Sequence, residues 1–162
     1  MAFSLLLLMD KIPAQTEKPN IKEFWHSVST TADPSEIWQI WTDVKNWKVW
    51  DTGLQDAEIK GTMGLGTKGK ITTLQGRKVN FKVVEWEEGK SYTYKTALPL
   101  GSLYVKRYLE EKDGKTLFTH RVWFQGLTSG IFAKQLGEEF RDLLPGVLEN
   151  IKQIAEPKPS TK

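Results

Sequence analysis

The sequence predicts an α+β domain in which one antiparallel sheet is covered by one long C-terminal helix. From Leu54 to Gln125, apolar and polar residues alternate and turn residues interrupt the pattern at short intervals, which is typical of consecutive antiparallel strands. From Ser129 to Ala155 the apolar residues instead recur every three or four positions, the period of an amphipathic helix. The 162 residues amount to one domain, so sheet and helix must bury their apolar sides against each other.

The first expected elements are a strand and two short helical segments. Residues 23–30 are rich in aromatic and β-branched residues, which favours a strand. Asp33 suits the N-cap of a helix, Pro34 its first position, and Glu36 the third position of a capping box. The apolar residues that follow at helical spacing are Ile37, Ile40, Trp41 and Val44, then Trp47 and Trp50 in a second turn.

The middle of the chain predicts six strands in an antiparallel meander. Short connections join them, and Asp113-Gly114 is the strongest hairpin signal. The expected strands span residues 57–60, 68–74, 78–86, 91–96, 102–111 and 116–125.

Residues 129–155 form the expected long helix. Pro145 lies inside it and should bend it or loosen one turn. Its apolar stripe consists of Phe132, Leu136, Phe140, Leu143, Val147, Ile151 and Ile154.

The expected domain spans residues 23–156, between a flexible lead-in at 1–22 and a tail at 157–162. The apolar run Phe3–Met9 is far shorter than the roughly 20 residues that cross a bilayer. No basic residue precedes this run and Asp10 follows it, which disfavours a secretory signal. We therefore expect a cytoplasmic protein in preference to a secreted or periplasmic one.

Composition excludes several classes of site. The chain has no cysteine, which excludes disulfide scaffolds, thiolate catalysis and iron–sulfur clusters. The net charge of +3 is too mild for a typical nucleic-acid-binding surface. Lys60–Lys95 holds eight Lys and Arg residues against three Glu, which we interpret as a solvated outer face. With only two histidines, His26 and His120, we expect no metal site and no cofactor.

One motif matches a nucleotide-binding pattern by letter only. Residues 64–69 read Gly-Leu-Gly-Thr-Lys-Gly, which fits G-x-G-x-x-G. The dinucleotide fingerprint requires a helix to begin inside the motif, whereas a strand is expected here. We interpret these glycines as turn residues.

His120 falls on the apolar side of its strand, because it alternates with Phe118 and Val122. One interpretation is a core or sheet-rim histidine with a satisfied hydrogen bond. The other is a histidine that contacts a ligand.

Arg107 lies between Val105 and Leu109 in the same kind of alternation. If that face is internal, Arg107 would pair with a carboxylate or phenolate of a ligand, because an unpaired buried charge is costly. The alternative is a strand near a sheet edge, from which the guanidinium reaches solvent.

The tryptophans are concentrated near the first helical segments. Four of the seven lie between Trp38 and Trp50. We expect Trp38 and Trp41 to anchor the first helix. Trp47 and Trp50 are three positions apart, so both can point the same way, and we expect them to form the rim of a site.

Three stretches carry a family resemblance. They are Ala-Asp-Pro-Ser-Glu-Ile-Trp at 32–38 continuing to Trp50-Asp51, the Gly-Leu-Gly-Thr turn at 64–67, and the strand ending at Gln125 with the helix after it. Over residues 23–155 the chain resembles the START/Bet v 1-like (SRPBCC) superfamily and, within it, the polyketide cyclase/dehydrase family. The resemblance implies a helix-grip fold: a seven-stranded antiparallel sheet wrapped round the long helix, two short helices after strand 1, and an internal cavity.

The resemblance also implies a function. We expect the cavity to bind or transport a hydrophobic or aromatic small molecule or a lipid. One alternative is a cyclase- or dehydratase-like enzyme in which His120 or Tyr94 transfers protons. The other is a protein-interaction module that uses the basic strand face. The family has no universal catalytic residue to transfer to this sequence.

The expected site combines inward strand residues, helix residues and the tryptophan rim. We expect a monomer or weak dimer, no nucleic-acid partner and no stable membrane insertion. The expected ligand-binding residues are Trp47, Trp50, Phe81, Tyr94, Arg107, His120, Val122, Phe132, Leu136, Phe140 and Leu143.

Overall fold

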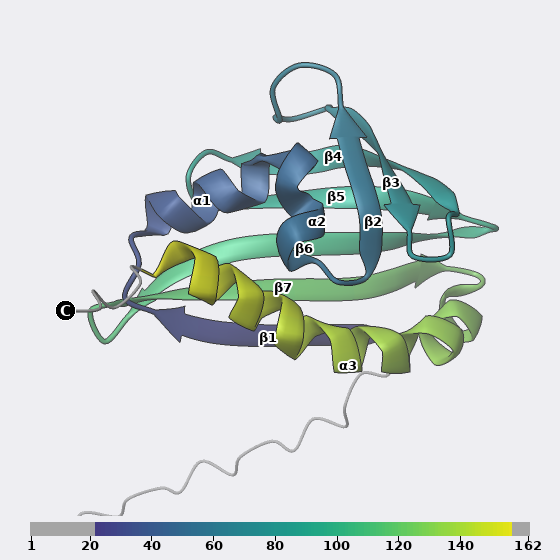
Figure 1. Cartoon of the computed structure of the whole chain (residues 1–162). Helices are drawn as coiled ribbons and strands as arrows, with labels where there is room; N and C mark the ends of the chain where they lie inside the picture. The colour runs from purple at the N-terminus through teal and green to yellow at the C-terminus, as the bar shows by residue number, and fades with distance from the viewer. Residues whose placement is uncertain (1–21, 157–162) are drawn as a thin grey trace, which may run out of the picture.

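The computed structural model describes residues 22–156 (Figure 1). The expected lead-in, apart from Lys22, and the expected tail at 157–162 lie outside the described residues.

Seven antiparallel strands form one sheet with the order β1-β7-β6-β5-β4-β3-β2. The meander predicted for the middle of the chain is confirmed, and the first strand closes the sheet by pairing with the last. The strands are β1 Glu23–Thr30, β2 Leu54–Ile59, β3 Lys68–Thr73, β4 Lys78–Glu87, β5 Ser91–Leu98, β6 Gly101–Lys112 and β7 Lys115–Gly126.

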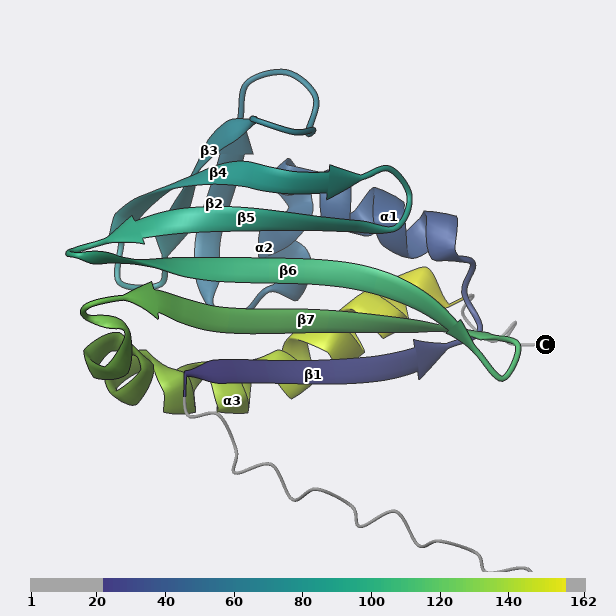
Figure 2. The ribbon, with the colours of Figure 1, turned by 180° about the vertical axis from the view of Figure 1, so that it is seen from behind.

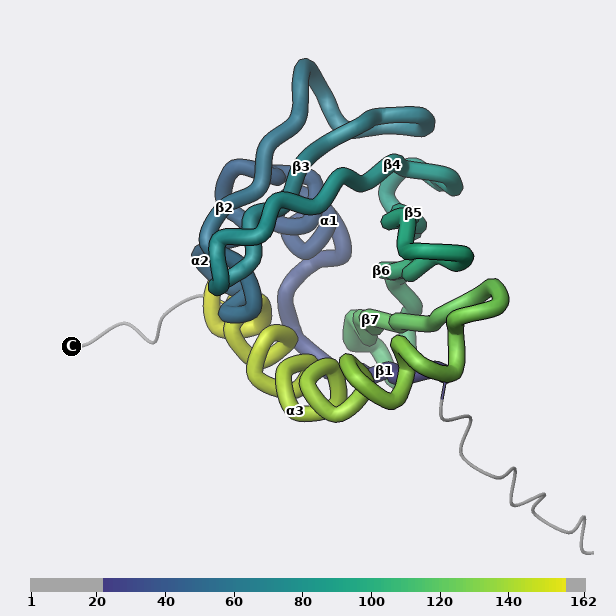
Figure 3. Tube along the Cα trace, turned by 90° about the vertical axis from the view of Figure 1, so that its right-hand side faces the viewer, coloured from purple at the N-terminus to yellow at the C-terminus, as the bar shows by residue number. Residues whose placement is uncertain are grey.

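The sheet curls, and the helices close its concave side (Figures 2 and 3). The long helix α3 packs against β1 and β7 and also contacts α1 and α2. The helices are α1 Pro34–Thr42, the 3-10 turn η1 Val44–Asn46, α2 Trp47–Trp50 and α3 Ser129–Ala155. One core therefore lies between α3, the short helices and the inner face of the sheet.

The start of α1 confirms part of the capping prediction. Asp33 occupies the N-cap and Pro34 the first helical position. The Asp33 side chain makes no capping hydrogen bond, so the predicted capping box is wrong. The backbone carbonyl of Asp33 instead accepts from the amide of Glu36 at 3.0 Å.

The buried stripe of α3 is rotated from the predicted one by about one residue in its N-terminal half, whereas Val147 and Ile151 are buried as predicted. Small residues, Ala133 and Gly137, face the sheet, whereas Ile154 is exposed. A Cβ on Gly137 would lie 2.3 Å from the ring of Phe24, so the absence of a side chain lets α3 approach β1 closely. Phe132, Leu136, Phe140 and Leu143 are in consequence half-buried and pack at the edge of the core.

Candidate functional site

A guanidinium is buried in the middle of the molecule. Arg107 projects from β6, which lies between β5 and β7, and is 1% exposed. Its guanidinium carbon lies 4.4 Å from the ring centre of Trp47 and 4.8 Å from that of Trp50. The rings of Tyr92 and Tyr94 are 5.6 and 5.5 Å away. The internal placement predicted for Arg107 is confirmed, and the sheet-edge alternative is wrong.

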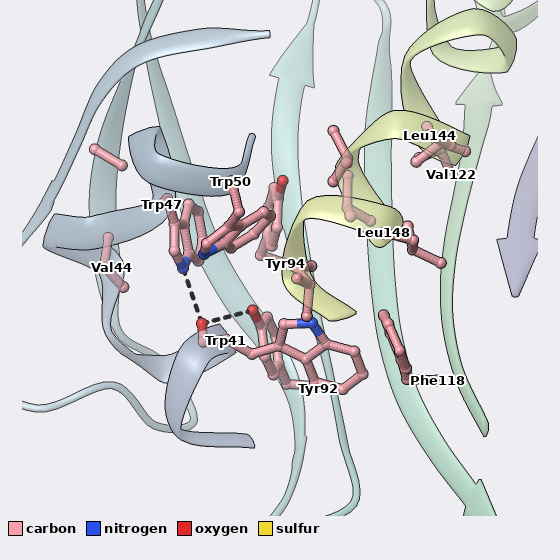
Figure 4. Packing of buried hydrophobic residues seen from close by; sticks show 14 of the residues in the cluster. Trp41, Val44, Trp47, Trp50, Tyr92, Tyr94, Phe118, Val122, Leu144 and Leu148 are labelled. Carbon is pink, nitrogen blue, oxygen red and sulfur yellow. Dashed lines mark hydrogen bonds between the residues drawn. The ribbon is translucent and has the colours of Figure 1, made fainter. Parts of the chain in front are cut away.

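A chain of hydrogen bonds ties Arg107 to the end of α1. Its Nη1 donates to the Tyr92 hydroxyl at 2.5 Å, which donates to the backbone carbonyl of Trp41 at 3.0 Å. The same carbonyl accepts from Trp47 Nε1 at 2.8 Å (Figure 4). Since Trp41 is the residue before the last of α1, the helix end fixes both the tyrosine and the tryptophan that flank the guanidinium.

Asp51 supplies a carboxyl group near this charge. It directly follows α2, and its Oδ1 accepts from the Gly53 amide at 3.0 Å. Burial raises the pKa of Asp51, and the positive charge of Arg107 opposes that rise. Burial likewise raises the pKa of Tyr92, to about 12, so its hydroxyl is neutral.

Sequence reasoning missed Asp51 and Tyr92. The signal for Tyr92 was available, because it alternates with the candidate Tyr94 on one strand. The signal for Asp51 was weaker, because an acidic residue in a connection usually faces solvent.

His120 lies beside Arg107 on the neighbouring strand, where the two are register partners of β6 and β7. Its ring centre is 5.5 Å from that of Trp41 and 5.9 Å from that of Trp50. Burial, and then the charge of Arg107, hold the pKa of His120 well below 6.5, so the imidazole is neutral. The predicted inward orientation is confirmed, but Nε2 has no hydrogen-bond partner, unlike the satisfied core histidine of the first interpretation.

Four buried polar atoms in this region have no hydrogen-bond partner. They are Arg107 Nε, Trp41 Nε1, Trp50 Nε1 and His120 Nε2. The first three are N–H donors. We call Arg107, Trp41 and Trp50, together with His120, the donor cluster. A buried donor without a partner costs about 1–3 kcal/mol, and such groups in native proteins usually meet a water or a ligand.

The remaining predicted strand residues surround this centre. Trp47 stacks on Phe81 and on Tyr94, with ring centres 5.5 and 5.7 Å apart. Val122 lies two positions from His120 on the inner face of β7. Burial raises the pKa of the Tyr94 phenol, so its hydroxyl stays protonated.

The predicted tryptophan rim is wrong. Trp47 and Trp50 are completely buried, because they cover the guanidinium instead of facing an opening. The predicted cavity wall of Phe81, Tyr94, Arg107, His120 and Val122 also needs correction. These side chains are at most 7% exposed, so they do not line an opening to solvent. The interior around Arg107 is therefore closed to solvent in this structure.

The predicted helix residues occupy a more open region. Phe132, Leu136, Phe140 and Leu143 are half-buried along the N-terminal half of α3. They pack at the edge of the core together with other half-buried apolar residues, Leu98 and Leu103 among them. Phe140 reaches Phe124 of β7, with ring centres 6.2 Å apart. The least closed apolar part of the core thus lies along this half of the helix.

A hollow of about 600 Å³ lies elsewhere, over β2, β3 and β4. It is broad and open, and it includes none of the predicted site residues. Its lining residues are Glu58, Ile59, Lys60, Gly66, Lys68, Gly69, Lys70 and Asn80. Residues 68–73 after the glycine turn form a strand, which confirms that this turn is not a dinucleotide-binding loop.

Within residues 22–156, no three His, Asp or Glu side chains gather closely enough to hold a metal ion. In the same range no helix combines the length and apolarity needed to cross a membrane.

Comparison with known proteins gives one family match. The family model described as polyketide cyclase / dehydrase and lipid transport matches residues 23–156. No curated protein matches the chain.

Several solved structures share the fold. Hypothetical protein jhp0584 from Helicobacter pylori is 14% identical, with a TM-score of 0.70 over 96% of this chain and 98% of that one. Ara h 8.0201 is 18% identical, with a TM-score of 0.63 over 82% and 96%. The di-domain ARO/CYC StfQ from the steffimycin biosynthetic pathway is 13% identical, with a TM-score of 0.66 over 83% and 50%. These similarities establish the helix-grip fold of the START/Bet v 1-like (SRPBCC) type that the sequence predicts.

Proposed function

Because the chain belongs to the polyketide cyclase / dehydrase and lipid transport family, we propose that it binds an apolar small molecule that carries an oxygen-rich head group. The donor cluster holds the head group, and the half-buried side of α3 receives the apolar body. The ligand is bound or carried without chemical change.

The observation that carries this proposal is the set of unpartnered polar atoms. Three of the four are N–H groups that can only donate, and Arg107 adds a permanent positive charge. Such a set requires acceptors. A carboxylate, a phenolate or a carbonyl oxygen would satisfy several of these donors at once, whereas an ammonium group, which only donates, would satisfy none of them.

The apolar body of the ligand would lie along the N-terminal half of α3. Phe132, Leu136 and Phe140 are half-buried, so a ligand can reach them with little rearrangement. Burying apolar surface contributes about 25 cal/mol per Å² before the cost of association. The apolar body therefore supplies most of the affinity, and the donor cluster supplies orientation.

The test begins with the purified protein. Native mass spectrometry and solvent extraction would identify a retained ligand, and a panel of fatty acids and polyphenols would be titrated against a displaceable apolar dye. We expect acidic amphiphiles to displace the dye and Leu136→Ser to weaken them. Ile154→Ser, an exposed position on the same helix, serves as the control and should bind normally. No displacement by any member, together with no retained ligand, would sink the proposal.

A cyclase- or dehydratase-like enzyme is the second candidate. Two residues near Arg107 support it, because burial raises the pKa of Asp51 and lowers the pKa of His120. A carboxyl with a raised pKa and a neutral imidazole could give and accept protons on a poly-carbonyl chain. If it is an enzyme, the wild type should convert an aromatic poly-ketone, and Asp51→Asn and His120→Ala should stop turnover while ligand binding persists. Absence of turnover by the wild type would count against it.

A further inference from the structure

Three large aliphatic side chains are exposed together at one end of the molecule. Leu100 in the β5–β6 turn is 73% exposed, Leu127 in the β7–α3 turn 88%, and Ile131 in the first turn of α3 58%. Figures 1 and 2 place these turns and the start of α3 at the same end of the sheet. We call these three residues the aliphatic tip.

Hydrogen bonds hold the tip residues in place. The amide of Leu127 donates to the carbonyl of Leu100 at 3.0 Å, and the Thr128 hydroxyl donates to the carbonyl of Pro99 at 2.6 Å. The amide of Ile131 donates to the carbonyl of Thr128 at 3.0 Å. The two turns and the helix start therefore present one fixed surface.

The backbone of Leu100 is unfavourable for a leucine. Its φ is +55°, in the left-handed region where glycine or asparagine is usual and a bulky residue is strained. The side chain points into solvent, so core packing does not offset this strain. A leucine at this position therefore has no evident benefit to the fold itself.

The charge around the tip is positive. Lys134 is exposed one helical turn after Ile131, and the Lys22 side chain comes within 3.9 Å of the position that a Cβ on Gly130 would take. Residues 91–109 and 114–137, which supply the tip and its flanks, contain no Asp or Glu. Aliphatic side chains next to Lys134, in chain segments without Asp or Glu, match an anionic lipid surface, in which the side chains enter the acyl boundary and the lysine meets phosphates.

From this geometry we propose that the aliphatic tip docks reversibly on an anionic membrane surface. Phe132 and Leu136, which follow the tip on α3, belong to the half-buried apolar region. Membrane contact would place that region against the lipid, so that an apolar ligand could pass between the membrane and the protein. This ligand transfer rests on the proposed function. The docking itself requires only the tip.

The test is sedimentation of the full chain with vesicles of phosphatidylcholine alone and of phosphatidylcholine with about one third phosphatidylglycerol. We expect binding to the anionic vesicles and about a tenfold weaker partition for Leu127→Asp. Leu65→Asp is the matched control, since Leu65 is 70% exposed in the β2–β3 loop, and should bind as the wild type does. Leu100→Gly should also weaken binding, while its thermal midpoint stays the same or rises because the strain is relieved.

Three results would overturn the docking proposal. One is a wild type that ignores anionic vesicles, and another is an equal loss for Leu65→Asp and Leu127→Asp. The third is a concentration-dependent dimer that Leu127→Asp dissociates, since a second copy would then cover the tip.

Two further measurements separate this proposal from the proposed function. Leu127→Asp should bind ligand normally in solution, and Arg107→Met should bind vesicles normally while losing acidic ligands. Loss of vesicle binding alone counts against the tip, and absence of ligand binding alone counts against the donor cluster.

Discussion

The charge of Arg107 is tolerated in the interior because aromatic rings and one hydroxyl surround it. The rings of Trp47 and Trp50 lie within 4.8 Å of the guanidinium carbon, a distance at which cation–π attraction is favourable. The hydroxyl of Tyr92 is the only side-chain acceptor for Arg107 among the hydrogen bonds of residues 22–156. The buried guanidinium therefore depends on this one hydrogen bond for a side-chain acceptor.

Tyr92→Phe should lower the free energy of unfolding by about 1–3 kcal/mol, because it leaves a buried guanidinium N–H without an acceptor. Chemical denaturation monitored by circular dichroism would measure the change. Tyr104→Phe is the control, since Tyr104 stacks on Trp123 through its ring and lies half-exposed on the sheet. A Tyr92→Phe variant as stable as Tyr104→Phe would contradict the account of this bond.

His120 should make stability depend on pH. Its folded pKa lies well below 6.5, so below pH 6.5 the unfolded chain binds a proton that the folded chain excludes. Stability should then fall as the pH decreases from 6.5, by up to about 1.4 kcal/mol per pH unit. The raised pKa of Asp51 acts with the opposite sign.

The measurement is the difference between the wild type and His120→Gln in unfolding free energy across pH 5–7. We expect this difference to change steadily with pH, because the wild type should lose stability relative to His120→Gln as the pH falls. A difference that is constant with pH would mean that His120 is not held neutral by burial.

Strand alternation was sufficient to place two of the central residues. Arg107 and His120 point inward as predicted, because period two leaves only two choices of face. Trp47 and Trp50 were misplaced, because a helix of four residues has no stripe that reveals what it packs against. Asp51 lies in a connection, where no periodicity indicates burial.

At the scale of elements, α3 shows both the strength and the limit of sequence patterns. Its range, Ser129–Ala155, agrees with the prediction, since the 3.6-residue period is sustained over the whole segment. Its buried face was predicted from the largest apolar residues, whereas Gly137 actually meets the sheet. Hydropathy alone could not reveal this, because close packing selected a residue without a side chain.

Gly137→Ala should destabilise the protein by about 1–3 kcal/mol through overpacking against Phe24, although alanine favours a helix by about 1 kcal/mol over glycine. Gly146→Ala on the same helix should instead stabilise it by about 0.5–1 kcal/mol, because a Cβ there meets nothing within 4 Å. Thermal unfolding of both variants compares them directly. If both substitutions stabilise the protein equally, the close approach of α3 to β1 is wrong.

At the scale of the whole molecule, the order of elements was enough to predict the fold. Six consecutive strands with short connections allow few topologies, and one long apolar helix must cover the sheet. The closed interior could not be predicted in this way, because it depends on how aromatic rings fill the space around Arg107. The side chains predicted to line the cavity are closed off from solvent there.

A closed interior has a kinetic consequence. If the rings around Arg107 must move before a head group enters, the observed binding rate should approach a limit as ligand concentration rises. Stopped-flow measurement of tryptophan fluorescence would show this limit. A rate that increases linearly up to the diffusion range would indicate that the site is already open.

The most direct test of the central claim compares two ligands that differ only in the head group, dodecanoate and dodecanol. By isothermal titration, the wild type should bind the acid at least about tenfold more tightly than the alcohol, the effect of a charge-assisted hydrogen bond of about 1.5–3 kcal/mol. Arg107→Met should bind both ligands alike. Equal affinity of the wild type for the two ligands would contradict the account.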